Sequence, residues 1–106
     1  MGFLLRIRRK LVALQPLTDF EKRVLLEISN TKVGETLTYA ELAYKLGNRK
    51  KARAVGNALA KNLFPIIIPC HRVVLSNGIG GYKLGRAAKR FLLFIERYMC
   101  KLRNRM

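Results

Sequence analysis

A cysteine and a histidine stand side by side near the middle of the chain, in the string Pro69-Cys70-His71-Arg72-Val73-Val74. The thiolate form of cysteine is the nucleophile, and nearby basic or cationic groups lower its pKa from a usual value of about 8.5. An imidazole and a guanidinium follow Cys70 directly, so the string indicates a reactive cysteine. The alternative is a small buried side chain without chemistry, the usual role of a free cysteine. The string alone leaves both interpretations open.

The cysteine and histidine content argues against a metal centre. The chain contains two cysteines, Cys70 and Cys100, one histidine, His71, and no Cys-x-x-Cys pair. A structural zinc site needs four such ligands, so we expect no metal and no disulfide framework. Free thiols fit a reducing intracellular compartment, and we expect a cytoplasmic protein. No stretch approaches the roughly 18 apolar residues of a membrane span, so a membrane is not an expected partner.

Positive charge is the second strong feature of the composition. Across 106 residues, Lys and Arg total 22 against 6 acidic residues, which gives a formal net charge of +16. Such a surface suits nucleic acid, an acidic membrane or an acidic protein. The charges are spread along the chain, which disfavours a basic tail on a neutral domain. The length predicts one domain.

Local patterns predict a mainly helical domain around the cysteine string. Thr18 with Glu21, and Thr38 with Glu41, have the spacing of capping boxes, which begin helices. The expected helices cover about 18–29, 38–46, 50–61 and 84–101, the last with Phe91, Leu92, Ile95 and Met99 on one face. We expect residues 1–16 to form a lead-in strand or arm, residues 66–68 to be extended, and residues 76–81 to form a glycine-rich loop.

The two short helices around Gly47 have the proportions of a helix-turn-helix, with residues 52–61 as the second helix. Two antiparallel core helices would show the same pattern. A basic segment before the second helix favours DNA binding. The second helix carries small residues, however, and few long polar side chains that could read base edges. This composition predicts close contact with DNA without sequence reading.

Several segments together resemble the C-terminal domain of the O6-alkylguanine-DNA alkyltransferases, the methylated-DNA–protein-cysteine methyltransferases. The resemblance runs from about Thr18 to Glu96. The matching strings are T-Y-A-E-L-A (38–43), G-N (47–48), A-R-A-V-G-N-A-L (52–59), N-L-F-P-I-I-I-P-C-H-R-V-V (62–74) and Gly81-Tyr82. The resemblance implies a small domain of winged helix-turn-helix type over 18–106, with a short extended active-site segment. It leaves 1–17 as an N-terminal arm or remnant lead-in, where the family usually has another domain.

The resemblance also implies a reaction. Cys70 would accept the alkyl group from O6 of guanine in one irreversible step, without a cofactor. His71 would deprotonate Cys70 through a bridging water, and Glu96 would hold the imidazole in the required tautomer. The protein would act once, as a monomer, on double-stranded DNA that contains O6-alkylguanine. It would work at the chromosome.

The remaining family positions concern DNA and the base. Arg53 would fill the gap left by the extruded nucleotide, and Tyr39 would rotate the 3′ phosphate. Ala52 and Gly56 lie on the helix that would approach the minor groove. The pocket for the flipped guanine would involve Asn62 as a hinge, Pro65 and Tyr82 as lining, the Cys70 and Val73 carbonyls and the Lys83 backbone N–H. Lys83 stands where some members have serine.

Each assignment has a plainer alternative. Arg53 could be one more solvated charge, Glu96 a surface residue paired along its own helix, Asn62 only a helix cap, and the tyrosines ordinary core or rim aromatics. Two alternative functions also stay open. One is a non-catalytic alkyltransferase-like lesion binder, although such proteins replace the acceptor cysteine and this chain keeps it. The other is a small basic helix-turn-helix regulator with an inert thiol.

Overall fold

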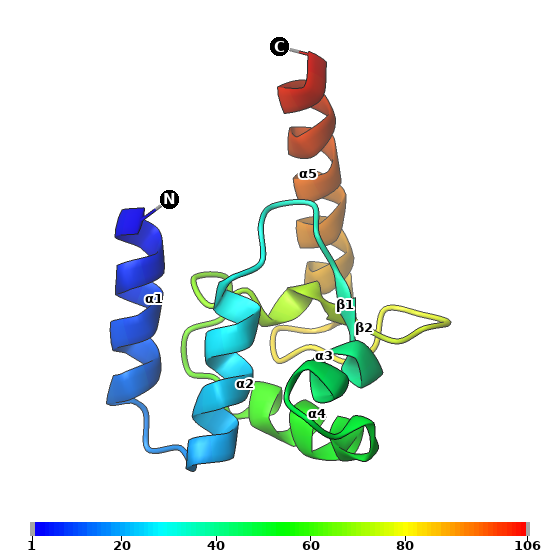
Figure 1. Ribbon diagram of the computed structural model, residues 1–106. Coiled ribbons are helices and arrows are strands. Elements are labelled where there is room, and N and C mark those ends of the chain that lie inside the picture. Colours follow the sequence, from blue (N-terminus) through cyan, green and yellow to red (C-terminus); the bar gives the residue numbers. More distant parts are fainter. Residues whose placement is uncertain (1, 106) are drawn as a thin grey trace.

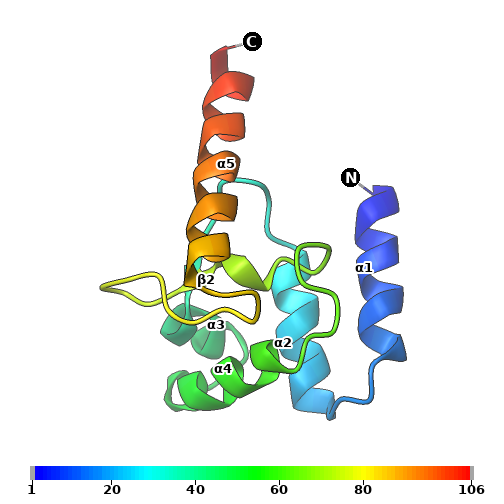
Figure 2. The same ribbon diagram turned by 180° about the vertical axis from the view of Figure 1, so that it is seen from behind.

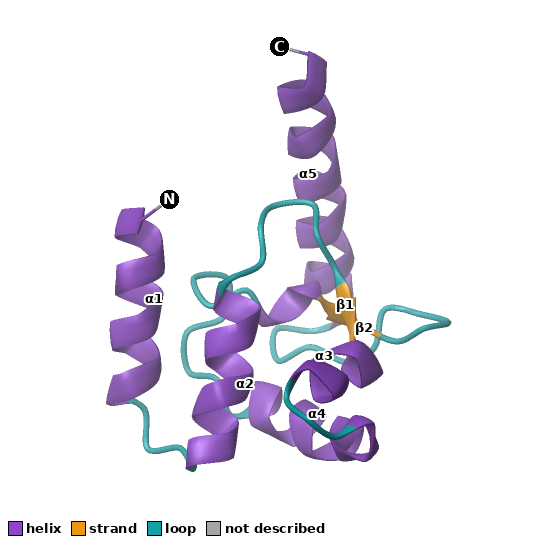
Figure 3. Ribbon diagram, viewed as in Figure 1, coloured by secondary structure: helices purple, strands orange, loops and turns teal. Residues whose placement is uncertain are grey.

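The computed structural model of the protein describes residues 2–105 and shows a mainly helical domain (Figures 1 and 3). Its α-helices are α1 (Gly2–Leu14), α2 (Asp19–Ser29), α3 (Tyr39–Lys45), α4 (Ala52–Ala60) and α5 (Arg86–Arg105). Two 3₁₀ helices, η1 (Arg49–Lys51) and η2 (Cys70–Arg72), and two strands, β1 (Leu37–Thr38) and β2 (Val73–Val74), complete it. The predicted fold class is confirmed.

Both predicted capping boxes are present. The Thr18 hydroxyl accepts a hydrogen bond from the Glu21 backbone N–H at 3.2 Å, and the Thr18 N–H donates to the Glu21 carboxylate at 2.9 Å. Thr38 and Glu41 repeat the arrangement at 3.0 and 2.9 Å. Each box satisfies backbone donors that the first turn of a helix leaves free. Helices α2 and α3 therefore begin where the sequence predicts.

The core lies where α1, α2, α3 and α4 meet the segment that carries Cys70. Its buried hydrophobic residues are Val12, Val24, Leu25, Ile28, Leu42, Ala43, Val55, Ala58, Leu59, Ile68, Cys70 and Val73. The strands β1 and β2 pair in parallel, with Leu37 opposite Val73 and Thr38 opposite Val74. This pairing joins the start of α3 to the end of η2, although the two are far apart in sequence.

The N-terminal segment is helical, and the expectation of a lead-in strand is wrong. Helix α1 lies beside α2 (Figures 1 and 2), and its Val12 is almost completely buried. The basic residues that interrupt the apolar ones here do so at a spacing that leaves one face of a helix apolar. Pro16 then disfavours helical geometry for the residue before it, which ends the element.

Residues 66–68 form a turn, so the expectation of an extended run is also wrong. Ile66 has a φ of 78°, and Ile68 N–H donates to the Phe64 carbonyl at 3.0 Å. Proline on each side of the run, Pro65 and Pro69, lacks the backbone donor that a paired strand needs. Cys70 consequently stands at the start of η2, and only β2 after it is extended.

Helix α5 departs in part from the predicted pattern. Leu92 and Ile95 are half-buried, but Phe91 and Met99 are exposed, so the predicted apolar face is not buried as a unit. The helix contacts η2 through Glu96 at its middle, which binds His71 and Arg72, and its C-terminal part then projects away from the body of the molecule (Figures 1 and 2). Within residues 2–105, no helix has the length and apolar character that crossing a membrane requires.

Candidate active site

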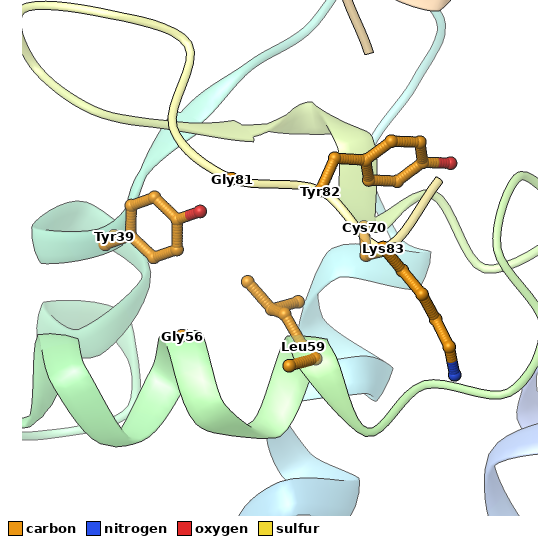
Figure 4. A pocket seen from close by; sticks show the side chains of 8 residues that line it. Tyr39, Gly56, Leu59, Cys70, Gly81, Tyr82 and Lys83 are labelled. Atoms are coloured by element: carbon orange, nitrogen blue, oxygen red, sulfur yellow. The ribbon is translucent and has the colours of Figure 1, made fainter. Parts of the chain in front are cut away.

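A cavity of about 330 Å³ opens beside Cys70. Its lining residues are Tyr39, Gly56, Leu59, Ala60, Cys70, Gly81, Tyr82 and Lys83. Figure 4 shows Gly56 and Leu59 on α4 along one side, Tyr39 on α3 at one end, and the glycine-rich loop with Tyr82 and Lys83 on the opposite side. Three separate parts of the chain thus enclose the space, and Cys70 on a fourth part places its thiol at the wall.

Cys70 is 6% exposed, and its environment acts on the thiol in opposite directions. Burial raises the pKa of Cys70 above its usual value. Asn62 Nδ2, 3.5 Å from Sγ, and the charges of Lys89 and Lys83 favour the thiolate without offsetting the burial. The net direction is upward, so the thiol needs a base to become a nucleophile.

His71 and Glu96 supply a base and the group that orients it. Nε2 of His71 lies 2.7 Å from the Glu96 carboxylate, and Arg72 binds both oxygens of that carboxylate at 2.9 Å. Burial alone would raise the pKa of Glu96, but the hydrogen bonds of His71 and then Arg72 outweigh it and lower the pKa to about 2. Glu96 is therefore ionised at neutral pH and accepts, so the His71 proton sits on Nε2.

The second nitrogen of His71 is then the proton acceptor. Nδ1 is buried and has no hydrogen-bond partner among residues 2–105. The Tyr82 hydroxyl, also buried without a partner in this part of the chain, belongs to a ring that meets the imidazole edge-on at 6.2 Å between centroids. Burial raises the pKa of Tyr82 to about 12, so this group stays neutral. The arrangement provides a basic nitrogen next in sequence to the thiol.

The predicted DNA-contacting residues divide into two groups. Tyr39 and Gly56 line the cavity, and a Cβ built on Gly56 would lie 3.6 Å from the Tyr39 ring. Ala52 and Arg53 stand at the start of α4, outside the cavity lining, and Arg53 is exposed. All four lie on α3 or α4, so one helix pair carries them. Their roles toward DNA stay predictions.

The predicted pocket residues are also divided. Tyr82 and Lys83 line the cavity, whereas Asn62, Pro65 and Val73 do not. Asn62 is fully buried behind Cys70. The Val73 carbonyl, predicted to read the base edge, accepts a hydrogen bond from Lys89 Nζ at 2.6 Å. The base contacts of these groups stay predictions.

The sequence interpretation missed Lys89 and treated Arg72 only as a cation beside Cys70. Arg72 is 3% exposed and, besides Glu96, donates to the Thr31 carbonyl at 2.7 Å. Lys89 is completely buried and bonds the Val73 and Gly81 carbonyls, and burial lowers its pKa to about 8. Arg72 is part of the conspicuous string, so its proximity to Cys70 was a usable signal. Lys89 looks like any helical lysine, because its partners come from distant segments.

The described residues contain no cluster of three or more His, Cys, Asp or Glu side chains that could hold a metal ion.

The comparison with protein families matches residues 19–98 to "6-O-methylguanine DNA methyltransferase, DNA binding domain". The chain belongs to the 6-O-methylguanine DNA methyltransferase family. The match includes every catalytic and DNA-contacting residue predicted from the sequence.

Individual relatives agree with this assignment of the chain to the methyltransferase family. The methylated-DNA–protein-cysteine methyltransferase of Methanocaldococcus vulcanius is 46% identical over 86 residues, which are 81% of this chain and 52% of the relative. The crystal structure of O6-methylguanine-DNA methyltransferase from Pyrococcus kodakaraensis strain KOD1 has a TM-score of 0.70 at 47% identity, covering 76% of this chain and 47% of that one.

A further relative was solved with DNA. The structure of Mycobacterium tuberculosis OGT in complex with DNA has a TM-score of 0.75 at 41% identity, and covers 77% of this chain and 51% of that chain. The present chain spans about half the length of the relatives it matches. What it shares with them is the part that carries the cysteine, the histidine and the helix pair α3–α4.

Proposed function

We propose that this protein removes an alkyl group from O6 of guanine in double-stranded DNA and keeps it on Cys70. The observation that carries the proposal is a thiol at the wall of a cavity of about 330 Å³, next to a histidine that an ionised Glu96 orients. The names of the relatives and their similarity over the same residues support it. The protein is then a methylated-DNA–protein-cysteine S-methyltransferase that acts once.

The chemical step is a displacement at the alkyl carbon. His71 Nδ1 takes the Cys70 proton through a bridging water, and the Glu96 carboxylate stabilises the imidazolium that forms. The thiolate attacks the alkyl carbon, the bond from that carbon to O6 breaks, and its electron pair stays with guanine. The dealkylated guanine takes up one proton, which balances the proton that Cys70 gave to His71. The thioether is stable, and the protein is not regenerated.

Access to O6 requires the nucleotide to leave the stack, because a thiolate at a cavity wall cannot reach into a duplex. Tyr39 at the start of α3 would turn the phosphate, and Arg53 near the start of α4 would occupy the space in the stack. Ala52 and Gly56 on α4 have small side chains or none, which would allow the helix to lie close to the minor groove. We expect the flipped base to enter beside Tyr82 with Pro65 as further lining. The Cys70 and Val73 carbonyls and the Lys83 backbone N–H would contact its edge, and Asn62 would act as the hinge.

The net charge of +16 supplies the attraction to phosphates that holds such a protein on DNA. We infer that one copy acts on one lesion, at the chromosome in the cytoplasm. Neither a metal nor an organic cofactor is needed for this displacement.

Counting the lesions that disappear tests this function against its alternatives. We expect a limiting amount of protein to remove O6-methylguanine from a duplex in equal molar amount and then to stop. A lesion binder would hold the modified duplex and leave every lesion in place. A regulator would prefer certain sequences and ignore the lesion. Either of these outcomes would overturn the proposal.

A further inference from the structure

The segment that joins α1 to α2 places an amide side chain behind the reactive cysteine. Gln15 is 3% exposed and lies outside residues 19–98, the part that matches the family. Its Oε1 accepts a hydrogen bond from the Leu63 backbone N–H at 2.9 Å, and its Nε2 donates to Asn62 Oδ1 at 3.4 Å. These contacts join positions that are nearly fifty residues apart in sequence.

The direction of these hydrogen bonds is set by a backbone group. A backbone N–H can only donate, so it fixes which end of the Gln15 amide is the oxygen. The Gln15 nitrogen must then face Asn62, and the Asn62 oxygen must face Gln15. The Phe64 N–H donates to the same Asn62 oxygen at 3.1 Å, which reinforces this orientation. The Asn62 nitrogen is left to point the other way.

That nitrogen meets the cysteine. Asn62 Nδ2 lies 3.3 Å from the Ile68 carbonyl and 3.5 Å from Cys70 Sγ. A donor aimed at sulfur favours the thiolate over the thiol, whereas an amide turned round would present its oxygen and oppose ionisation. The orientation of the Asn62 amide therefore affects how easily Cys70 loses its proton.

We propose that Gln15 is a positioning residue for Cys70: it holds the Asn62 amide with its nitrogen toward Sγ. The proposal rests on the proposed use of Cys70 as the acceptor, but its test needs no alkylated DNA. It also gives the N-terminal segment a part in the site. Arg8 on α1 binds the segment between Asn62 and Cys70. Its Nε donates to the Ile67 carbonyl at 2.6 Å, next to the strained residue Ile66.

The test measures the pH dependence of Cys70 alkylation by iodoacetamide, read by mass spectrometry of the peptide that contains Cys70. Gln15→Glu keeps the size and the acceptor for Leu63 but cannot donate to Asn62 when ionised. Gln15→Met is close in shape, uncharged and without either hydrogen bond, and keeps the test available if Gln15→Glu does not fold. Lys10→Met, an exposed change on α1, is the control.

For both Gln15 variants we expect the pH midpoint of Cys70 labelling to rise, and the rate at neutral pH to fall by about threefold or more. Lys10→Met should leave the pH midpoint and the rate of Cys70 labelling unchanged. The labelling of Cys100 should be the same in every variant. An unchanged midpoint in a folded Gln15 variant would overturn the proposal. So would labelling that becomes faster at every pH with the same midpoint, because that result means Gln15 only packs the segment.

Discussion

The carboxylate of Glu96 connects two residues, His71 and Arg72, and fixes the imidazole that the proposed reaction needs. It accepts from His71 and from two nitrogens of Arg72, and its side chain is only 13% exposed. The alternative of a surface glutamate paired along its own helix does not fit these contacts. Removing its charge would leave Arg72 buried with an unpaired cation, which is destabilising.

Stability at acid pH should therefore depend on Glu96. Its pKa in the folded protein, about 2, lies below its ordinary value of 4.5. A lowered pKa contributes stability that is complete above the ordinary value and is lost as the pH falls from about 4.5 toward 2. We expect chemical denaturation to show a steeper loss of unfolding free energy over this range in the wild type than in Glu96→Gln. Equal slopes would contradict the ion pair as described.

Arg53 offers a prediction about delivery of the base. We expect Arg53→Ala to slow repair of a duplex lesion far more than it weakens DNA binding, because a residue that fills the stack acts after binding. Lys50→Ala, in the same exposed basic segment, is the matched control and should lower binding and repair together. If Arg53→Ala behaves like the control, Arg53 is only a phosphate contact.

Sequence alone predicted Cys70, His71 and Glu96, because the first two share one string and the third followed from the family resemblance. It missed Lys89, and it treated Arg72 as a cation beside Cys70 and not as a partner of Glu96. Their importance comes from burial against Thr31, Glu96, Val73 and Gly81, which only the tertiary fold brings together. A charged residue in a chain this basic gives no local sign that it is buried.

Among the elements, α4 combines structure and proposed DNA contact most closely. Gly56 lies inside the helix, where glycine costs roughly 0.5–1 kcal/mol relative to alanine. An alanine Cβ there would meet the Tyr39 ring at 3.6 Å, an ordinary contact. We expect Gly56→Ala to raise the melting temperature but to weaken lesion repair, because the added methyl group stands between α4 and the cavity. Unchanged repair would show that close approach at this position is not needed.

The elements that were predicted correctly are those with strong local signals. The capping boxes at Thr18 and Thr38 identify the starts of α2 and α3 without any knowledge of the rest of the chain. The turn at Ile66 has no such signal, since an apolar β-branched run favours a strand and only the surrounding contacts impose a positive φ. Helix α1 was missed because its apolar face becomes evident only once α2 is there to cover it.

At the scale of the whole molecule, charge determines how the protein meets DNA. With a net charge of +16, binding should release counterions from the phosphates, and the binding constant should fall steeply with salt. We expect a linear fall in its logarithm against the logarithm of salt concentration, with a slope of about 0.9 per phosphate neutralised. Titration of unmodified duplex at several salt concentrations measures this slope. A shallow slope would contradict a phosphate-based interface.

Transfer to Cys70 is the central claim, and the intact mass of the protein tests it most directly. The protein and its Cys70→Ser variant are each incubated with duplex DNA that carries O6-methylguanine and are then weighed and digested. We predict that the wild type gains one methyl group, located on the peptide that contains Cys70, and that Cys70→Ser gains none. A wild-type protein that binds the duplex and keeps its original mass, or carries the methyl group on Cys100, would contradict the proposed function.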